Sequence, residues 1–87
     1  MEREHIAYQQ HLWRCRSWTT QTRIYTAELK QNLFGEWVVI RHWSGKNTRG
    51  GQKRTDYMES YGQGMALLDE TGKRRVQRGY VEDKSSL

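Results

Sequence analysis

The sequence predicts a small α+β domain: a mainly antiparallel β-sheet of about four to five strands with one C-terminal α-helix packed on it. Three observations lead to this class. Residues 12–58 contain short, largely alternating apolar and polar segments separated by turn residues, as closely spaced strands do. Residues 60–79 show the apolar spacing of a helix instead. The 87 residues leave room for only one core.

The strands are predicted from side chains that alternate with a period of two. Tyr25, Ala27 and Leu29 fall on one side of a strand whose other side is polar, with Ile24 as the exception. The segment that begins at Trp37 is β-branched and aromatic, the composition of a central strand. The predicted strands cover residues 12–18, 23–30, 37–43 and 53–58.

The helix is predicted to begin after Ser60, a plausible N-cap, and to end at Gly79. Tyr61, Met65 and Leu68 follow helical spacing between them. Three glycines inside the helix each cost about 0.5–1 kcal/mol relative to alanine, so packing on the sheet has to sustain it. The domain is predicted to cover residues 11–81, between a polar, partly disordered segment at 1–10 and a polar tail at 82–87.

Composition favours a soluble cytoplasmic protein. No apolar run approaches the ~20 residues that cross a bilayer, and the N-terminal residues do not form a secretory signal. A single cysteine, Cys15, indicates a reducing compartment and excludes a disulfide framework. The three histidines show no metal-ligand spacing, and no serine lies in a nucleophile motif. We therefore expect no enzymatic activity, no catalytic residue, no cofactor, no metal site and no membrane partner.

The net charge of +5 lies entirely between residues 41 and 80, where nine cations face four acids. Clustered cations favour a polyanionic partner, although an ordinary solvated basic surface has the same composition. Trp43 ends an apolar strand, shares its face with Arg41, and precedes a basic, glycine-rich loop. An aromatic ring beside positive charge can stack on a sugar or base while the cations hold phosphates. The residues alone leave open whether Trp43 forms such a platform or belongs to the core.

The predicted nucleic-acid-binding residues fall into two groups. The first comprises Trp43 for stacking, with Arg41, Lys46, Arg49 and Lys53 for phosphates. The second is a flanking surface formed by Arg75, Arg78 and Tyr80. Cations at the end of a helix also stabilise its dipole, so the second group has a structural explanation too.

Four segments carry a resemblance to a known family: YTAEL at 25–29, LFGEWVVIRHW at 33–43, TRGGQ at 48–52 and RGY at 78–80. Their order and spacing resemble those of the WGR domain, a small domain named for a Trp-Gly-Arg motif and found in poly(ADP-ribose) polymerases and in bacterial stand-alone proteins. The resemblance implies a sheet with one helix across it, and nucleic-acid binding, DNA rather than RNA, without catalysis. It also implies that Trp43 packs on the sugar of a terminal nucleotide at a DNA strand end or break.

The chain departs from the family motif directly after Trp43. Ser44 and Gly45 stand where the family has Gly-Arg, and the first cation is Lys46. Lysine carries a point charge, so Lys46 cannot make the bidentate contact of the family's arginine, but it can still attract a phosphate. Tyr80 matches the closing aromatic residue of the family. The alternative function is a protein-interaction adaptor that uses the same Trp-rich surface without binding nucleic acid.

Overall fold

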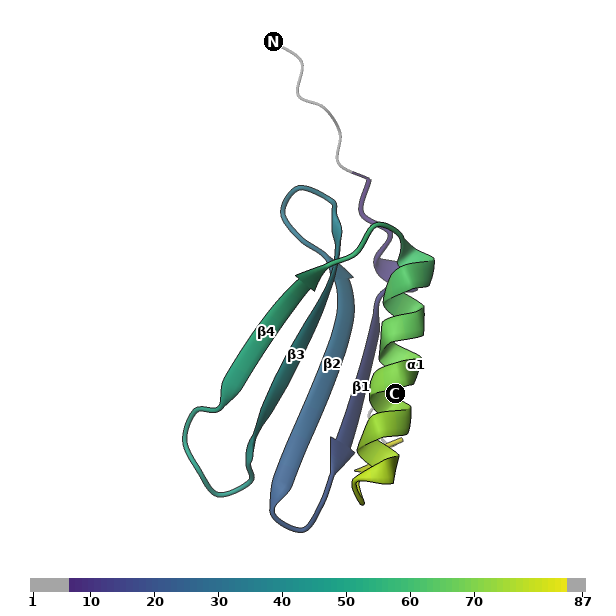
Figure 1. The fold of residues 1–87 in the computed structure, drawn as a ribbon. Coiled ribbons are helices and arrows are strands. Elements are labelled where there is room, and N and C mark those ends of the chain that lie inside the picture. Colours follow the sequence, from purple (N-terminus) through teal and green to yellow (C-terminus); the bar gives the residue numbers. More distant parts are fainter. Residues whose placement is uncertain (1–6, 85–87) are drawn as a thin grey trace.

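The computed structural model describes residues 7–84 as a five-stranded antiparallel sheet with one helix across it (Figure 1). The strand order is β4-β3-β2-β1-β5. The predicted α+β class is therefore confirmed. The elements are η1 (Gln10–Leu12), β1 (Arg14–Thr19), β2 (Arg23–Gln31), β3 (Trp37–Gly45), β4 (Gln52–Tyr57), α1 (Tyr61–Gln77) and β5 (Val81–Glu82). Much of the segment predicted to be partly disordered, residues 1–6, lies outside the described residues.

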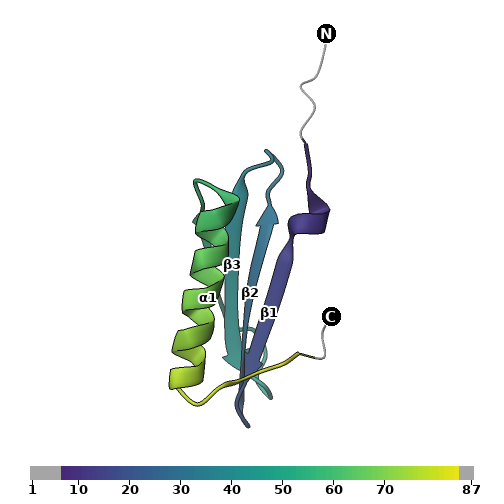
Figure 2. The ribbon, with the colours of Figure 1, turned by 90° about the vertical axis from the view of Figure 1, so that its right-hand side faces the viewer.

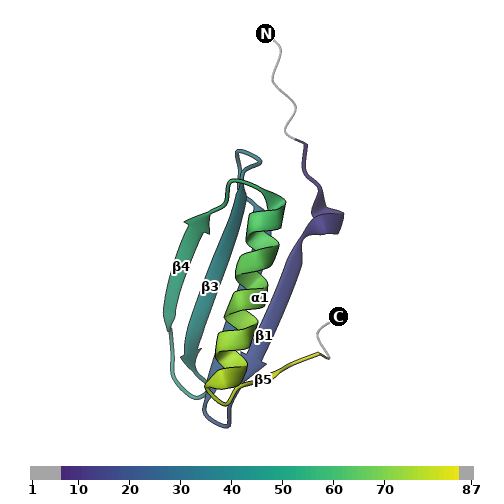
Figure 3. The same cartoon turned by 45° about the vertical axis from the view of Figure 1, so that its right-hand side comes forward.

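Several boundaries differ from the prediction. The third strand ends at Gly45 rather than at residue 43, and the fourth covers Gln52–Tyr57 rather than residues 53–58. The first strand begins at Arg14 rather than Leu12, because Leu12 closes a 3-10 turn in which its N–H donates to the carbonyl of Gln9 at 2.8 Å. Glu82, which we expected in the polar tail, lies in β5 opposite Trp18 of β1 (Figure 3). Its carboxylate accepts a hydrogen bond from Arg16 at 2.7 Å, and composition alone does not show this partner.

The helix covers one face of the sheet, and in the described chain no element covers the other face (Figure 2). Residues opposite each other on paired strands share a face, so Trp18, Tyr25 and Trp43 form one row under the helix. Ile24, the exception to the predicted alternation, lies on the uncovered face. The buried core comprises Trp18, Tyr25, Ala27, Leu29, Val39 and Leu68.

The helix begins and ends where its capping residues predict. The hydroxyl of Ser60 accepts a hydrogen bond from the N–H of Gln63 at 3.0 Å. The side chain of Gln63 in turn accepts from the N–H of Glu59 at 2.6 Å. At the other end, Gly79 has a φ of +87°, which favours glycine and turns the chain back toward β5.

Two of the helix glycines lie where the helix contacts the sheet. Gly64 and Gly72 are buried, and Gly64 lies against the side chain of Leu29. A Cβ at Gly72 would lie 2.9 Å from a guanidinium nitrogen of Arg16 and 3.1 Å from the indole of Trp18. These glycines weaken the isolated helix but let it approach the sheet closely. The packing that the sequence requires is therefore present.

We predict opposite effects from alanine at two glycines of this helix. Gly64→Ala places a methyl group against Leu29 and should lower the free energy of unfolding by about 1–3 kcal/mol. Gly62→Ala is the matched control: its nearest neighbour is the Ser60 hydroxyl at 3.9 Å, and helix propensity should raise stability by up to about 1 kcal/mol. Urea unfolding of both variants measures the difference. Equal effects would show that close packing does not explain Gly64.

Candidate functional site

The candidate site is a cleft of about 530 Å³ at the end of the sheet where β2 begins and α1 ends. It is lined by Arg23, Tyr25, Trp43, Arg75, Arg78 and Tyr80, which we call the aromatic–basic cleft. None of these residues is acidic, so three guanidinium groups and three aromatic rings line it. This is a composition that favours an anionic ligand with a flat or apolar part.

Strand pairing fixes the position of Trp43. Tyr25 of β2 lies directly opposite Trp43 of β3, and their rings stack with centroids 5.6 Å apart and planes 10° apart. Tyr25 is itself 8% exposed and contacts Trp18 edge-on at 6.2 Å. The partly buried Trp43 ring therefore packs against the buried ring of Tyr25 and also lines the cleft. Trp43 thus packs against the core and also borders the candidate site, and its role as a stacking platform stays a prediction.

Arg75 joins the helix to this aromatic row. Its guanidinium carbon lies 4.3 Å from the ring centroid of Tyr25 and 5.2 Å from that of Tyr80. The backbone turn after the helix makes this possible, because the N–H of Tyr80 donates to the carbonyl of Arg75 at 2.9 Å. Gly79 supplies the positive φ that this turn needs. The end of the helix thus positions Arg75 and Tyr80 together.

The cleft brings together some predicted site residues and leaves others elsewhere. Trp43, Arg75, Arg78 and Tyr80 line it, although the first belongs to a different segment from the other three. Lys46 lines a neighbouring hollow formed with the β1–β2 turn and Gly79. Arg49 is exposed in the β3–β4 loop, outside the residues that line the cleft. Lys53 pairs with His42 and lies on the uncovered face of the sheet.

Arg41 lies on the same face as Trp43 but is held by an acid. Its guanidinium donates to Asp56 at 2.6 Å, and Arg54 donates to the other carboxylate oxygen at 3.1 Å. Burial raises the pKa of the Asp56 carboxyl, but the hydrogen bonds and charges of Arg41 and Arg54 lower this pKa by more. Asp56 is therefore ionised at neutral pH and offsets part of the charge that we predicted for phosphate binding.

Sequence reasoning missed two lining residues, Arg23 and Tyr25. Both lie on the face of β2 that was assigned to the core, two positions apart. One sequence pattern could have identified Arg23. It lies two positions before Tyr25 in the strand, so both side chains point to the same face, and Arg23 places a cation at the end of an otherwise apolar face. The cross-strand partner Trp43 was not part of that pattern, since register cannot be read from one strand.

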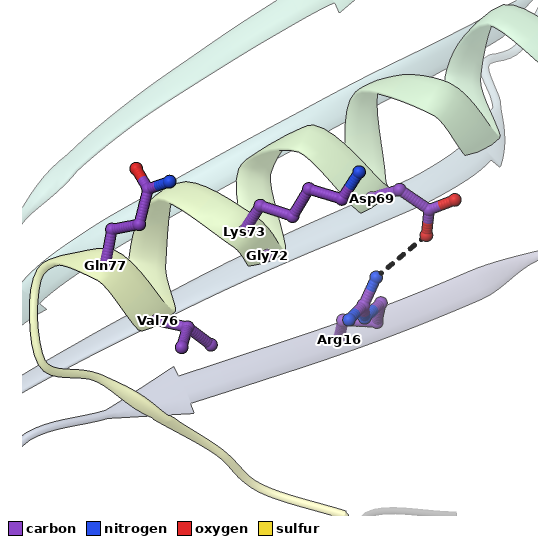
Figure 4. Close-up of a pocket in the computed structure, with 6 residues that line it drawn as sticks. All are labelled: Arg16, Asp69, Gly72, Lys73, Val76 and Gln77. Carbon is purple, nitrogen blue, oxygen red and sulfur yellow. Dashed lines mark hydrogen bonds and ion pairs between the residues drawn. The ribbon is translucent and has the colours of Figure 1, made fainter.

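A second hollow, of about 480 Å³, lies between α1 and β1 (Figure 4). Arg16 and Lys73 both line it, and Arg16 is already paired: it donates to Glu82 at 2.7 and 2.9 Å and to Asp69 at 3.2 Å. The hydrogen bonds from Arg16 hold the pKa of Glu82 below its ordinary value, although burial acts in the opposite direction. This network fastens β5 to the rest of the domain, and its one guanidinium is shared by two carboxylates.

Comparison with known proteins gives no relative. No protein-family model, curated protein or solved structure matches the chain. The resemblance to the WGR domain therefore rests on the four segments alone and stays a prediction.

Groups of metal ligands and membrane-spanning helices are both absent from the described part of the chain. Within residues 7–84, no group of three or more histidine, cysteine or acidic side chains is arranged to hold a metal ion. In the same part of the chain, no helix has both the length and the apolar character to cross a bilayer.

We predict that the Arg16–Glu82 pair makes stability depend on acid pH. The pKa of Glu82 is lower in the folded chain, so the pair stabilises fully above the unfolded value of about 4.3 and loses this effect as pH falls through the folded value. In Glu82→Gln, the free energy of unfolding should fall less between pH 7 and pH 3 than in the wild type. Glu59→Gln, which removes an exposed carboxylate, is the control and should keep the wild-type dependence. Identical profiles for all three proteins would contradict the assignment.

Proposed function

We propose that this chain is a non-catalytic module that binds nucleic acid in the aromatic–basic cleft. One observation carries the proposal: Trp43 meets Arg75, Arg78 and Tyr80 in a cleft without acids, although 31 residues lie between Trp43 and Arg75 in the chain. The sequence had separately predicted phosphate binding by the segment around Trp43 and by the end of the helix. Proteins that bind nucleic acid commonly combine an aromatic surface, which stacks on a sugar or base, with cations that contact the flanking phosphates.

The geometry supports different roles for the aromatic and the basic residues of the cleft. Trp43 is held in place by its stack on Tyr25, so it can meet a sugar or base without first losing conformational freedom. Arg23 and Arg78 are exposed and have no ion pair in the described part of the chain, so they are available to phosphates. Lys46 extends the positive surface into the adjoining hollow, where its N–H donates to the carbonyl of Thr22 at 2.7 Å.

The resemblance to the WGR domain favours DNA over RNA, and strand ends or breaks over continuous duplex. The second preference has less support from the chain itself. Ser44 and Gly45 replace the family's Gly-Arg, and Lys46 lies in the neighbouring hollow rather than in the cleft. General phosphate binding is thus the firmer part of the proposal, and preference for ends is the part that a comparison of DNA forms has to decide.

A protein-interaction adaptor is the second candidate, and one observation favours it. Leu33 and Phe34 are 83% and 77% exposed in the β2–β3 turn, at the opposite end of the sheet. This turn is well ordered, because the Asn32 side chain accepts from the N–H groups of Phe34 at 2.9 Å and Glu36 at 3.0 Å. Two large apolar side chains held in solvent by a stable turn are typical of a protein contact.

We predict that variants in the cleft weaken DNA binding. Trp43→Ala removes the stacking surface and should weaken affinity by about 5- to 150-fold, the effect of one lost base or sugar stack. Arg78→Gln should weaken it several-fold. Lys30→Gln is the control: it loses the same charge on the uncovered face and should bind like the wild type. Fluorescence anisotropy with labelled blunt, nicked and single-stranded DNA measures the affinities, and thermal unfolding verifies the fold.

Three outcomes of this titration are decisive. Absence of binding to any DNA form at low salt would contradict the proposal and leave the adaptor as the remaining candidate. Equal weakening by Lys30→Gln and Arg78→Gln would show that net charge, not the cleft, governs binding. Equal affinity for all DNA forms would remove the preference for ends while leaving nucleic-acid binding in place.

We also predict a salt dependence set by the number of phosphates contacted. If three cleft arginines and up to two loop cations each neutralise a phosphate, log K against log salt should have a slope of about −2.7 to −4.5 on duplex DNA. Arg78→Gln should make this slope shallower by about 0.9. The measurement is the same anisotropy titration at several salt concentrations. A slope near zero would indicate that the cleft contacts no phosphate.

A further inference from the structure

A small pocket of about 150 Å³ adjoins the aromatic–basic cleft between α1 and the sheet. Tyr25 and Arg75 line both spaces, so the two meet at these residues. We call the smaller space the inner pocket. Its polar lining consists of Arg41, Arg74, Arg75, Thr71 and Glu70. It therefore gathers three arginines from β3 and α1 around a space much smaller than the cleft.

Two of these arginines have donors without partners. The Nε atoms of Arg41 and Arg75 are buried, and no acceptor among the described residues takes a hydrogen bond from either. Asp56 occupies only Nη2 of Arg41, and the contacts of Arg75 are with the faces of aromatic rings. A buried donor without an acceptor destabilises the folded chain, and more so when the group is charged. Both residues line the inner pocket, so an acceptor there that reached their guanidinium groups would reduce this destabilisation.

The charge balance favours an anion as that acceptor. Asp56 pairs with Arg54 as well as with Arg41, so the three pocket arginines and Arg54 face two acids, Glu70 and Asp56, and two positive charges remain. Water also accepts hydrogen bonds, but it leaves this charge unbalanced. A pocket of 150 Å³ is larger than the share of one water, about 30 Å³, and smaller than most organic-ligand sites, which begin at about 300 Å³. A small oxyanion lies between these limits.

We propose that the inner pocket binds a tetrahedral oxyanion of the phosphate class. Guanidinium groups bind such anions through several charge-assisted hydrogen bonds at once, and Thr71 adds a hydroxyl. The anion is either free inorganic phosphate or the phosphate of a monoester whose organic part extends past Arg75 into the cleft. The proposal does not depend on nucleic-acid binding, because an anion alone fills the pocket.

The Nε–H signals of Arg41 and Arg75 in a proton–nitrogen NMR spectrum test the inner pocket directly. Addition of inorganic phosphate at constant ionic strength should shift both signals to a saturating limit, while chloride should not. Arg74→Gln, at an exposed residue of the lining, should weaken this binding roughly tenfold through the loss of a charge-assisted contact. Lys73→Gln is the matched control, since it removes the same charge one residue away and outside the inner pocket, and it should change affinity less than about twofold.

Titration with ribose 5-phosphate separates the two sources of the anion. Saturating shifts with inorganic phosphate support the free anion, and shifts with ribose 5-phosphate alone support a monoester. Shifts with neither, or equal weakening by Arg74→Gln and Lys73→Gln, would overturn the proposal. The anisotropy titration with DNA keeps the two proposals distinct. If DNA binds but neither phosphate ligand shifts the Nε–H signals, only the inner-pocket proposal is refuted. If either phosphate ligand shifts these signals but DNA does not bind, only the nucleic-acid function is refuted.

Discussion

The register of β2 between its two neighbours determines most of this structure. It places Trp18, Tyr25 and Trp43 in one row across the sheet, beneath the end of α1. The buried Tyr25 is the centre of that row: it meets Trp18 edge-on and stacks on Trp43. A slip of one residue would turn Tyr25 to the uncovered face and remove both the core contact and the base of the candidate site. The same pairing thus supports the fold and the cleft.

The arginines on the helix-covered side of the sheet are of two kinds: some form ion pairs with acids and others do not. Arg16 and Arg41 are held by carboxylates within the layer between helix and sheet, where they fasten β5 and β4. Arg23, Arg75 and Arg78 line the cleft, whose lining contains no carboxylate. Three arginines without an ion pair in the described chain therefore meet in the cleft. This separation supports an anionic ligand better than the net charge does, because a net charge says nothing of position.

Local patterns predicted the elements well, whereas contacts between distant segments stayed hidden. Alternation in β2 identified its buried face, and Ser60 and Gly79 marked the ends of the helix, because each depends on neighbouring residues only. The site was predicted in two unconnected halves, since nothing in the sequence states that Trp43 lies opposite Tyr25. For the same reason Lys53 was grouped with Trp43, although strand parity places it on the uncovered face. Glu82 was assigned to the tail because its partner, Arg16, lies 66 positions away.

Arg75 has a position that links the inner pocket to the cleft. Its guanidinium lies between Tyr25 and Tyr80, while its Nε is buried and without an acceptor in the described chain. An anion that bound this Nε would restrict the side chain and, through it, the ring of Tyr80 at the edge of the cleft. The ordering would then be complete before a larger ligand arrived, which lowers the entropic cost of its binding. Because such coupling is reciprocal, a ligand in the cleft that orders Arg75 would strengthen anion binding to the same extent.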